Sequence, residues 1–336
     1  MGVMEYRRLG RTGVKVSKFC LGCMTFGGRT EEKDAMDIID RAIDGGINFL
    51  DTANVYNRGL SEQAVGKALK RNCKRDRIVL ATKVHGTMDD DDPNGEGNHR
   101  RHIIQQCEAS LKRLQTEHID LYQIHRPDSE IPIDETLRAL DDLIRAGKVR
   151  YIGTSTFAAW QVMESLWISK ELGLNRFICE QPPYHPLDRR IERELIPMAK
   201  TYGIGLIPWS PLAGGFFTGK YSRDEEPSEG TRFHNSGGRE GLFSDEAFDV
   251  LDVIEEIAKD KGCTPSQLAL AWCAHQSGIT SPITGPRTME QLEDNLGAAD
   301  VEITEEDCDK IDEVSPSGHV IAPFYKADFG PHEFGW

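Results

Sequence analysis

Short apolar runs alternate with amphipathic stretches along most of this chain, and that alternation constrains its fold more than any other feature. Eight runs have the length and apolar character of buried strands: 19–22, 47–51, 78–83, 119–125, 149–153, 177–181, 204–209 and 280–283. Between them apolar residues recur at helical spacing, which predicts helices at about 35–43, 61–72, 100–116, 134–146, 158–172 and 189–202. Strand–helix alternation implies a parallel sheet with right-handed crossovers, and eight such units close into an α/β fold, the (β/α)8 TIM barrel.

Several segments fall outside this repeating unit. Residues 5–17 alternate around two glycines and predict an N-terminal β-hairpin before the barrel. The stretch 213–244, after the seventh strand, is rich in Gly, Ser and charge, so we expect a long loop over the mouth of the barrel. Extra C-terminal helices are predicted as well, because Thr264 and Thr304 each begin a typical helix-capping sequence.

We expect one domain over residues 1–336, with a barrel core at about 4–315 and a C-terminal tail at 316–336. The tail carries aromatic residues without periodicity, namely Phe324, Tyr325, Phe329, Phe334 and Trp336. Three arrangements stay open for it: packing on the barrel, covering a substrate mouth, or remaining mobile.

The balance of charge excludes some classes of function. The chain of 336 residues carries 40 Lys and Arg against 55 Asp and Glu, a formal net charge of -15. Nucleic acids and anionic membranes attract basic faces, so we expect neither as a main partner, although a local basic pocket is compatible with this balance. The acidic run 89–92 is followed by Pro, Asn and Gly, which predicts a solvated loop tip with no metal site.

Cysteine usage and apolar content indicate a cytoplasmic protein. Eight cysteines in a chain of this length do not suggest a disulfide framework. Cys20 and Cys23 have a CxxC spacing, but residues three apart on a strand point to opposite faces, so we expect no metal and no redox pair there. The N-terminus shows no apolar targeting segment, and no run reaches about 18 apolar residues.

Four reactive side chains lie at the exits of three consecutive strands: Asp51, Tyr56, Lys83 and His125. Singly, each has an ordinary explanation as a turn cap, a core phenol, a surface amine or a loop-bonded imidazole. Together they favour catalysis, because reactive groups of a TIM barrel gather at the C-terminal ends of its strands. Asp51 would hold the ammonium of Lys83, and the ammonium would stabilise a Tyr56 phenolate.

This arrangement predicts proton exchange with a carbonyl or alcohol oxygen. Tyr56 would be the acid in reduction and the base in oxidation. A neutral His125 would orient the carbonyl and donate a hydrogen bond to its oxygen. None of these groups can supply two electrons, so a hydride-donating cofactor is required.

Further motifs occur in a fixed order along the chain: Gly45–Ala53, Ser61–Glu62, Gly66–Leu69, His125–Asp128, Gly147–Gly153, Trp209–Ala213 and Gln291–Asn295. With the four reactive residues, they resemble the aldo-keto reductase family over roughly residues 4–315, and those four residues resemble its catalytic tetrad. The resemblance implies reversible, NADPH-dependent reduction of an aldehyde or ketone. The chain has no GxGxxG sequence opening a βαβ unit, which disfavours a Rossmann dehydrogenase.

The resemblance also implies how NADPH lies across the barrel mouth. Ser155 and Gln181 would bond its carboxamide, Trp209 would stack on the nicotinamide, and Asp51 would touch the ribose. Cys23 and Met24 are implied in the wall of the site beside the nicotinamide. Contacts with the cofactor further along, toward its pyrophosphate, are implied for Ser210, Pro211, Leu212, Gly214, Lys220 and Arg232. Many relatives carry Asn where this chain has Thr156, so its contact is open.

The adenosine end is implied at Gly285, Arg287, Gln291, Asp294 and Asn295. A helix N-terminus there can bind phosphate, and Arg287 can form charge-assisted bonds to a 2′-phosphate, which favours NADP over NAD. The same segment is also a good helix cap, and both roles are compatible.

A second class of function stays open. The branch resembled includes potassium-channel β subunits, which use a similar barrel as a nucleotide-binding regulatory partner, as well as bacterial and plant reductases. That group typically carries Asn at the position of His125, so the histidine favours an enzyme. We expect a small-molecule carbonyl or alcohol as partner, aromatic, aliphatic or sugar-derived, in a pocket of Phe26, Val55, His85, Trp209 and the tail aromatics. The oligomeric state is open.

Overall fold

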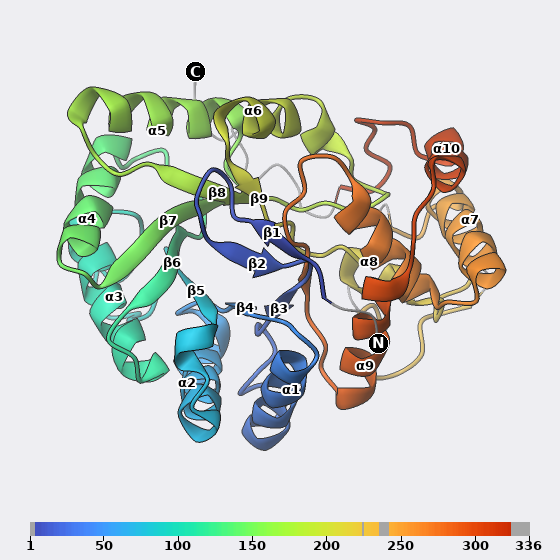
Figure 1. Cartoon of the computed structure of the whole chain (residues 1–336), viewed down its shortest axis with the longest axis horizontal. Coiled ribbons are helices and arrows are strands. Elements are labelled where there is room, and N and C mark those ends of the chain that lie inside the picture. Colours follow the sequence, from blue (N-terminus) through green and yellow to red (C-terminus); the bar gives the residue numbers. More distant parts are fainter. Residues whose placement is uncertain (1–3, 224, 235–241, 324–336) are drawn as a thin grey trace.

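Eight parallel strands form one sheet, in the order β10-β3-β4-β5-β6-β7-β8-β9 (Figure 1). Their bounds are β3 (Cys20–Gly22), β4 (Phe49–Asp51), β5 (Val79–Val84), β6 (Ile119–Ile124), β7 (Val149–Ser155), β8 (Phe177–Gln181), β9 (Gly205–Leu206) and β10 (Ile283–Thr284). The computed structural model describes residues 4–223, 225–234 and 242–323. Backbone bonds close the ring between β9 and β10: Thr280 N donates to Leu206 O at 2.8 Å, and Ile283 N donates to Pro208 O at 2.7 Å. The prediction of a (β/α)8 barrel is confirmed.

Helices cover the outside of the sheet (Figure 1). They are α1 (Glu32–Asp44), α2 (Leu60–Asn72), α3 (Arg100–Leu114), α4 (Ile133–Arg145), α5 (Ala159–Leu172) and α6 (Leu195–Tyr202). In α1 one apolar stripe is buried, Ala35, Ile38, Ile39 and Ala42, as the spacing predicted. The buried face of α5 is more polar and holds Gln161, Val162, Ser165, Leu166 and Ser169.

The predicted helix at 189–202 is wrong in its first half. The structure shows a short 3₁₀ turn, η3 (Arg190–Glu192), and α6 begins only at Leu195. Pro197 explains the late start. Proline lacks an N–H and its ring clashes with the carbonyl four residues earlier, so it fits only in the first turn of a helix.

The N-terminal hairpin is confirmed and closes one end of the barrel. Strand β1 (Tyr6–Arg8) pairs antiparallel with β2 (Lys15–Ser17), and Figure 1 shows the pair lying across the strands. Leu9 and Val16 pack inside the barrel in a cluster with Cys20, Phe49, Ala81 and Leu121. Gly10 has φ +56°, and a Cβ there would lie 2.5 Å from Ile178 O, so only glycine allows this close approach.

The C-terminal part adds helices to the barrel: α7 (Asp245–Lys261), α8 (Pro265–His275), α9 (Met289–Gly297), the 3₁₀ turn η6 (Ala298–Asp300) and α10 (Glu305–Val314). The predicted caps are confirmed, since the Thr264 and Thr304 side chains accept bonds from Gln267 N and Asp307 N.

The insertion between β9 and β10 is more ordered than a plain loop. It opens with a 3₁₀ segment, η4 (Ala213–Thr218), and aromatic rings then tie it to α7. Phe216 lies 5.2 Å from Phe248 and 6.3 Å from Tyr221, between ring centroids. Residues 224 and 235–241 of the insertion lie outside the described part of the chain.

The start of the tail packs on the loop after β8. Ile321 N donates to Leu187 O at 3.0 Å, and Arg189 N donates to His319 O at 2.9 Å. The aromatic residues named for the tail, 324–336, lie outside the described residues. The single-domain boundaries stay a prediction.

All eight cysteines are free thiols. Cys20 lies in the cluster inside the barrel, whereas Cys23 packs in the outer core between sheet and helices. Their side chains therefore point to opposite faces, as predicted.

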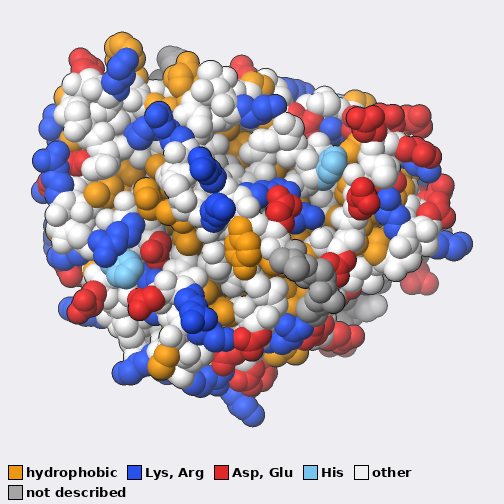
Figure 2. All heavy atoms as spheres, viewed as in Figure 1, with side chains coloured by type: hydrophobic (Ala, Val, Ile, Leu, Met, Phe, Trp, Pro, Cys, Tyr) orange, Lys and Arg blue, Asp and Glu red, His pale blue; other side chains and the backbone are white. Residues whose placement is uncertain are grey.

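Charge is spread unevenly over the face that carries the hairpin. Figure 2 shows acidic side chains gathered over α7 and α10, while Lys and Arg are spread over the rest of this face. Among the described residues, no helix is long and apolar enough to cross a membrane.

Candidate active site

Three of the predicted reactive residues form one chain of contacts at the C-terminal end of the barrel. Lys83, on β5, is fully buried, and its ammonium donates to Asp51 Oδ2, to Thr52 O at 2.9 Å and to Tyr56 Oη at 3.1 Å. Burial disfavours the charged amine, but the charges of Asp51 and Tyr56 outweigh it, and the pKa of Lys83 lies above its usual range. Lys83 therefore carries a full positive charge against the phenol oxygen.

Tyr56 reaches this position through a distorted turn. It begins η1 (Tyr56–Gly59), in which Asn57 and Arg58 adopt φ of 50° and 52°. The Asn57 amide explains this shape, because it donates to Met24 O at 3.1 Å and Phe26 O at 2.8 Å. The turn thus holds the phenol at the mouth between β4 and β5.

His125 completes the group and is neutral. Its ring meets that of Tyr56 edge-on, with centroids 5.6 Å apart and planes at 78°. The side chain is half-buried and lines the cleft described below. Burial, and then the charges of Lys83 and Arg126, hold the pKa of His125 well below its usual value.

Two glutamines hold the other oxygen of Asp51. Gln123 Nε2 and Gln181 Nε2 each donate to Asp51 Oδ1 at 2.9 Å, and Gln181 Nε2 also donates to Gln123 Oε1 at 3.1 Å. Sequence reasoning named Gln181 but missed Gln123. The signal was available, because Gln123 lies two residues before His125 on β6 and so shares its face of the strand.

A cleft of about 1390 Å³ opens beside this group. Asp51, Tyr56 and His125 line its inner end, whereas Lys83 lies behind them, fully buried. All residues predicted for the cofactor line the same cleft: Cys23, Met24, Asp51, Ser155, Thr156, Gln181, Trp209, Ser210, Pro211, Leu212, Gly214, Lys220, Arg232, Gly285, Arg287, Gln291, Asp294 and Asn295. Their individual roles stay predictions.

Cations gather in the outer half of the cleft, from Arg29, Lys220, Arg232 and Arg287. Burial and the charges of Arg287 and Arg232 lower the pKa of Lys220, and burial together with Arg29 lowers that of Arg232. Mutual repulsion of this kind favours a polyanion as occupant. The prediction missed Arg29, which lies far from the other three in sequence.

The outermost part of the cleft serves two purposes at once. At the start of α9, the Thr288 side chain accepts from Gln291 N at 3.3 Å, and Gln291 Oε1 accepts from Arg287 N at 2.8 Å. Asp294 Oδ1 accepts from Thr264 Oγ1 at 2.9 Å and from Gln267 Nε2 at 3.0 Å. Thr264 and Thr288 therefore cap helices while they also line the cleft, and Asp294 ties α9 to the start of α8.

The turn after β7 is held from behind by a buried acid. Glu180, fully buried, accepts from Phe157 N at 3.1 Å and from the Thr154 hydroxyl, and burial raises its pKa to about 8. Thr156 sits in this turn at φ 60°, a strained conformation, and its hydroxyl donates to Ser155 O at 2.6 Å. Sequence reasoning missed Glu180, since an acid inside a strand gives no motif.

The predicted substrate pocket is wrong at Phe26. This ring is fully buried and packs in the core between sheet and helices. Trp209 lines the cleft, whereas Val55 and His85 lie outside its lining. Phe26 was misplaced because its side-chain direction depends on the turn held by Asn57.

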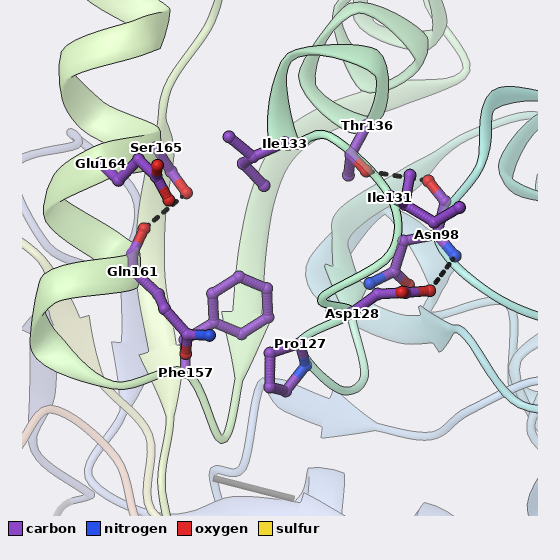
Figure 3. Close-up of a pocket in the computed structure, with 10 residues that line it drawn as sticks. All are labelled: Asn98, Pro127, Asp128, Ile131, Ile133, Thr136, Phe157, Gln161, Glu164 and Ser165. Atoms are coloured by element: carbon purple, nitrogen blue, oxygen red, sulfur yellow. Dashed lines mark hydrogen bonds between the residues drawn. The ribbon is translucent and has the colours of Figure 1, made fainter. Parts of the chain in front are cut away.

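A second, small cavity of about 40 Å³ lies behind the turn that follows β7. Figure 3 shows α5 on one side of it, and loop residues with the start of α4 on the other. Thr136 Oγ1 donates to Asn98 O at 2.8 Å in its wall. A space of this size suits a buried water rather than a substrate.

Comparisons with known proteins agree with this geometry. A family model described as the Aldo/keto reductase family matches residues 18–316. The chain is 40% identical to the "Uncharacterized oxidoreductase YrpG" of Bacillus subtilis (strain 168), over 93% of this chain and 96% of that protein. It is 37% identical to a "Probable voltage-gated potassium channel subunit beta" of Arabidopsis thaliana, over 89% and 92% of the two chains.

A third relative is the "Versiconal hemiacetal acetate reductase" of Aspergillus parasiticus, 36% identical over 92% of this chain and 96% of that protein. The fold, the site and these matches define an oxidoreductase barrel. The chain belongs to the aldo/keto reductase family, and the predicted branch, with channel β subunits and reductases, is confirmed.

Proposed function

We propose that this protein is an NADPH-dependent reductase that converts a small aldehyde or ketone to its alcohol, reversibly, with Tyr56 as the general acid. The observation that carries the proposal is the 3.1 Å contact of Lys83 Nζ with Tyr56 Oη, at the inner end of a cleft whose outer half is cationic. A small carbonyl compound in the cytoplasm is the proposed substrate.

The residues of the cleft fit a nicotinamide dinucleotide phosphate. Arg29, Lys220, Arg232 and Arg287 match a pyrophosphate and a third phosphate in a chain whose net charge is -15. At the inner end, both amide hydrogens of Gln181 bond inside the barrel, so its carbonyl oxygen is the group that can accept from a carboxamide. When bound, such a cofactor supplies the hydride.

The chain itself supplies the proton. As negative charge develops on the carbonyl oxygen, Tyr56 Oη gives up its proton to that oxygen. The ammonium of Lys83 stabilises the phenolate that remains, and Asp51 balances the ammonium. His125 is neutral, so it can donate a ring N–H to the same oxygen and orient it. In oxidation the phenolate takes the proton back.

A regulatory subunit is the alternative, because relatives named as potassium-channel β subunits are nearly as similar as those named as oxidoreductases. The complete set of Tyr56, Lys83, Asp51 and a neutral His125 favours catalysis over nucleotide binding alone.

The test is a screen of aromatic, aliphatic and sugar-derived carbonyl compounds with the purified protein, following NADPH oxidation. We expect turnover with at least one class, and Tyr56→Phe should lose on the order of 10²–10⁴-fold in kcat. Full activity in Tyr56→Phe would exclude the phenol as the acid. NADPH binding without turnover on any compound would leave the regulatory alternative.

A further inference from the structure

Asp51 is bonded more completely than its pairing with Lys83 requires. Oδ2 accepts from the ammonium, and Oδ1 accepts from two separate amides, those of Gln123 and Gln181, both at 2.9 Å. Gln123 is fully buried, and Gln181 is 3% exposed. Neutral donors of this kind stabilise a buried carboxylate in its charged form, where burial alone would favour the neutral acid.

The direction of these bonds follows from charge. An ionised carboxylate only accepts, so both glutamines must turn their NH₂ groups toward Asp51. The remaining hydrogen of Gln181 Nε2 then meets Gln123 Oε1 at 3.1 Å. Gln123 thus donates to Asp51 through Nε2 and accepts from Gln181 through Oε1. Flipping its amide group by 180° would break both hydrogen bonds.

The strands leave room for this side chain at one point. Gly153, on β7, pairs with Gln123 in the sheet. A Cβ at Gly153 would lie 2.4 Å from Cys179 Sγ and 3.4 Å from Gln123 Cγ. A Cβ there would clash with Cys179 Sγ but would only touch Gln123 Cγ at an ordinary contact distance, so glycine lets β7 and β8 approach closely beside Gln123.

We infer that Gln123 is a positioning residue, which links Gln181 at the proposed nicotinamide end to the Asp51–Lys83–Tyr56 proton relay. It touches no reacting atom. It fixes Asp51 so that Oδ2 stays on Lys83, whose three N–H bonds to Asp51, Thr52 O and Tyr56 Oη are then all made. The inference rests on the proposed function for its kinetic readout.

Two variants separate positioning from plain packing. Gln123→Met keeps the length of the side chain but removes the donor and the acceptor. Gln123→Glu keeps the shape; as the neutral acid it still donates to Asp51, and as the carboxylate it repels it. A hydrogen bond to a charged group corresponds to a factor on the order of 10- to 100-fold, and we expect kcat of Gln123→Met to fall by about that factor throughout the pH range in which Tyr56 is protonated.

Gln123→Glu should instead lose kcat progressively as pH rises, relative to the parent. The introduced carboxyl would face Asp51 from β4, Lys83 from β5, and Gln181 and the Cys179 thiol from β8. A side chain that only fills space predicts the same pH profile for both variants and the parent. A Gln123→Glu profile parallel to that of the parent, or a parent-like kcat in Gln123→Met, would overturn the inference.

Gln276→Met is the matched control, since this half-buried glutamine lies at the end of α8, outside the cleft lining. It should keep the parent's kcat and pH profile. NADPH binding, followed by quenching of tryptophan fluorescence, should weaken less than kcat in Gln123→Met, because Gln181 keeps its bond to Asp51.

A readout without turnover keeps the inference testable if the proposed function fails. The difference in phenolate absorbance between the parent and Tyr56→Phe reports ionisation of Tyr56. Without the Gln123 amide, Asp51 interacts more strongly with the Lys83 ammonium, and the ammonium then stabilises the Tyr56 phenolate less. In Gln123→Met the phenolate signal should therefore appear at higher pH than in the parent. No movement of the signal would overturn the inference, whereas a parent without carbonyl reduction would count only against the proposed function.

Discussion

The two ends of the barrel use the same strands for opposite purposes. At the N-terminal end, Leu9 and Val16 of the hairpin segment pack in one apolar cluster with Phe49, which fills the interior of the barrel. At the other end, Asp51 and Lys83 lie two residues further along β4 and β5. Their buried charges are paired with each other, and Asp51 also accepts from two glutamine amides. Burying charge is costly unless every group is paired. The closed end therefore stabilises the fold by burying apolar surface, whereas the open end holds buried charges that are tolerated because each has its partners.

Removing the buried cation should have the largest effect at the open end. In Lys83→Met, Asp51 keeps a buried charge without its ion partner, so we expect the free energy of unfolding to fall by about 3–5 kcal/mol, together with loss of carbonyl reduction. Urea unfolding and NADPH oxidation measure the two effects. The double variant Asp51→Asn/Lys83→Met should recover part of the stability and none of the activity. If Lys83→Met had the same free energy of unfolding as the parent, Asp51 would not depend on the Lys83 ammonium for its stability in the folded protein.

The closed end should respond in stability alone. Leu9 is 1% exposed inside the barrel, so Leu9→Ala leaves a cavity and should lower the free energy of unfolding by about 2–5 kcal/mol. At a temperature where the variant stays folded, kcat should match the parent. Leu172→Ala, at an exposed position on α5, is the control and should change little. A fall in kcat for Leu9→Ala would mean that the two ends are coupled.

Charge at the outer cleft should affect the choice of cofactor. Arg287→Ala should weaken NADPH binding on the order of 10-fold or more and NADH binding far less, because charge-assisted bonds to a 2′-phosphate are lost. Dissociation constants for both nucleotides measure this. Arg41→Ala, which breaks the ion pair with Glu293 outside the cleft lining, is the control. Equal losses for NADPH and NADH would remove the argument for NADP.

The smallest expected effect is that of mild acid on His125. Since its pKa lies well below the usual value, kcat/KM should stay level as pH falls from about 7 to 5. The unfolded chain binds this proton near pH 6.5 and the folded chain does not. The stability contributed by the neutral ring is therefore complete above about pH 6.5 and is lost as pH falls toward the depressed pKa. An inflection of kcat/KM near pH 6.5, absent in His125→Asn, would contradict a neutral imidazole.

The sequence by itself determined the barrel, because its signals are local. The stripe of α1, the Thr264 and Thr304 caps and the order of strand and helix are all set by residues within a few positions of one another. The one wrong helix start shows the same principle, since Pro197 was a local signal left unused. The strand exits at Asp51 and Lys83 could be named for the same reason.

Only the tertiary structure decided which side chains meet. Gln181 and Asp51 are 130 residues apart in sequence yet bond at 2.9 Å, and Gln123 joins them from a third strand. Arg29 joins the cations of the cleft in the same way, from the other end of the chain. Such contacts depend on strand register and on closure of the ring, which no local pattern encodes. The sequence could therefore predict the tetrad, but the amide pair that holds its carboxylate required the folded barrel.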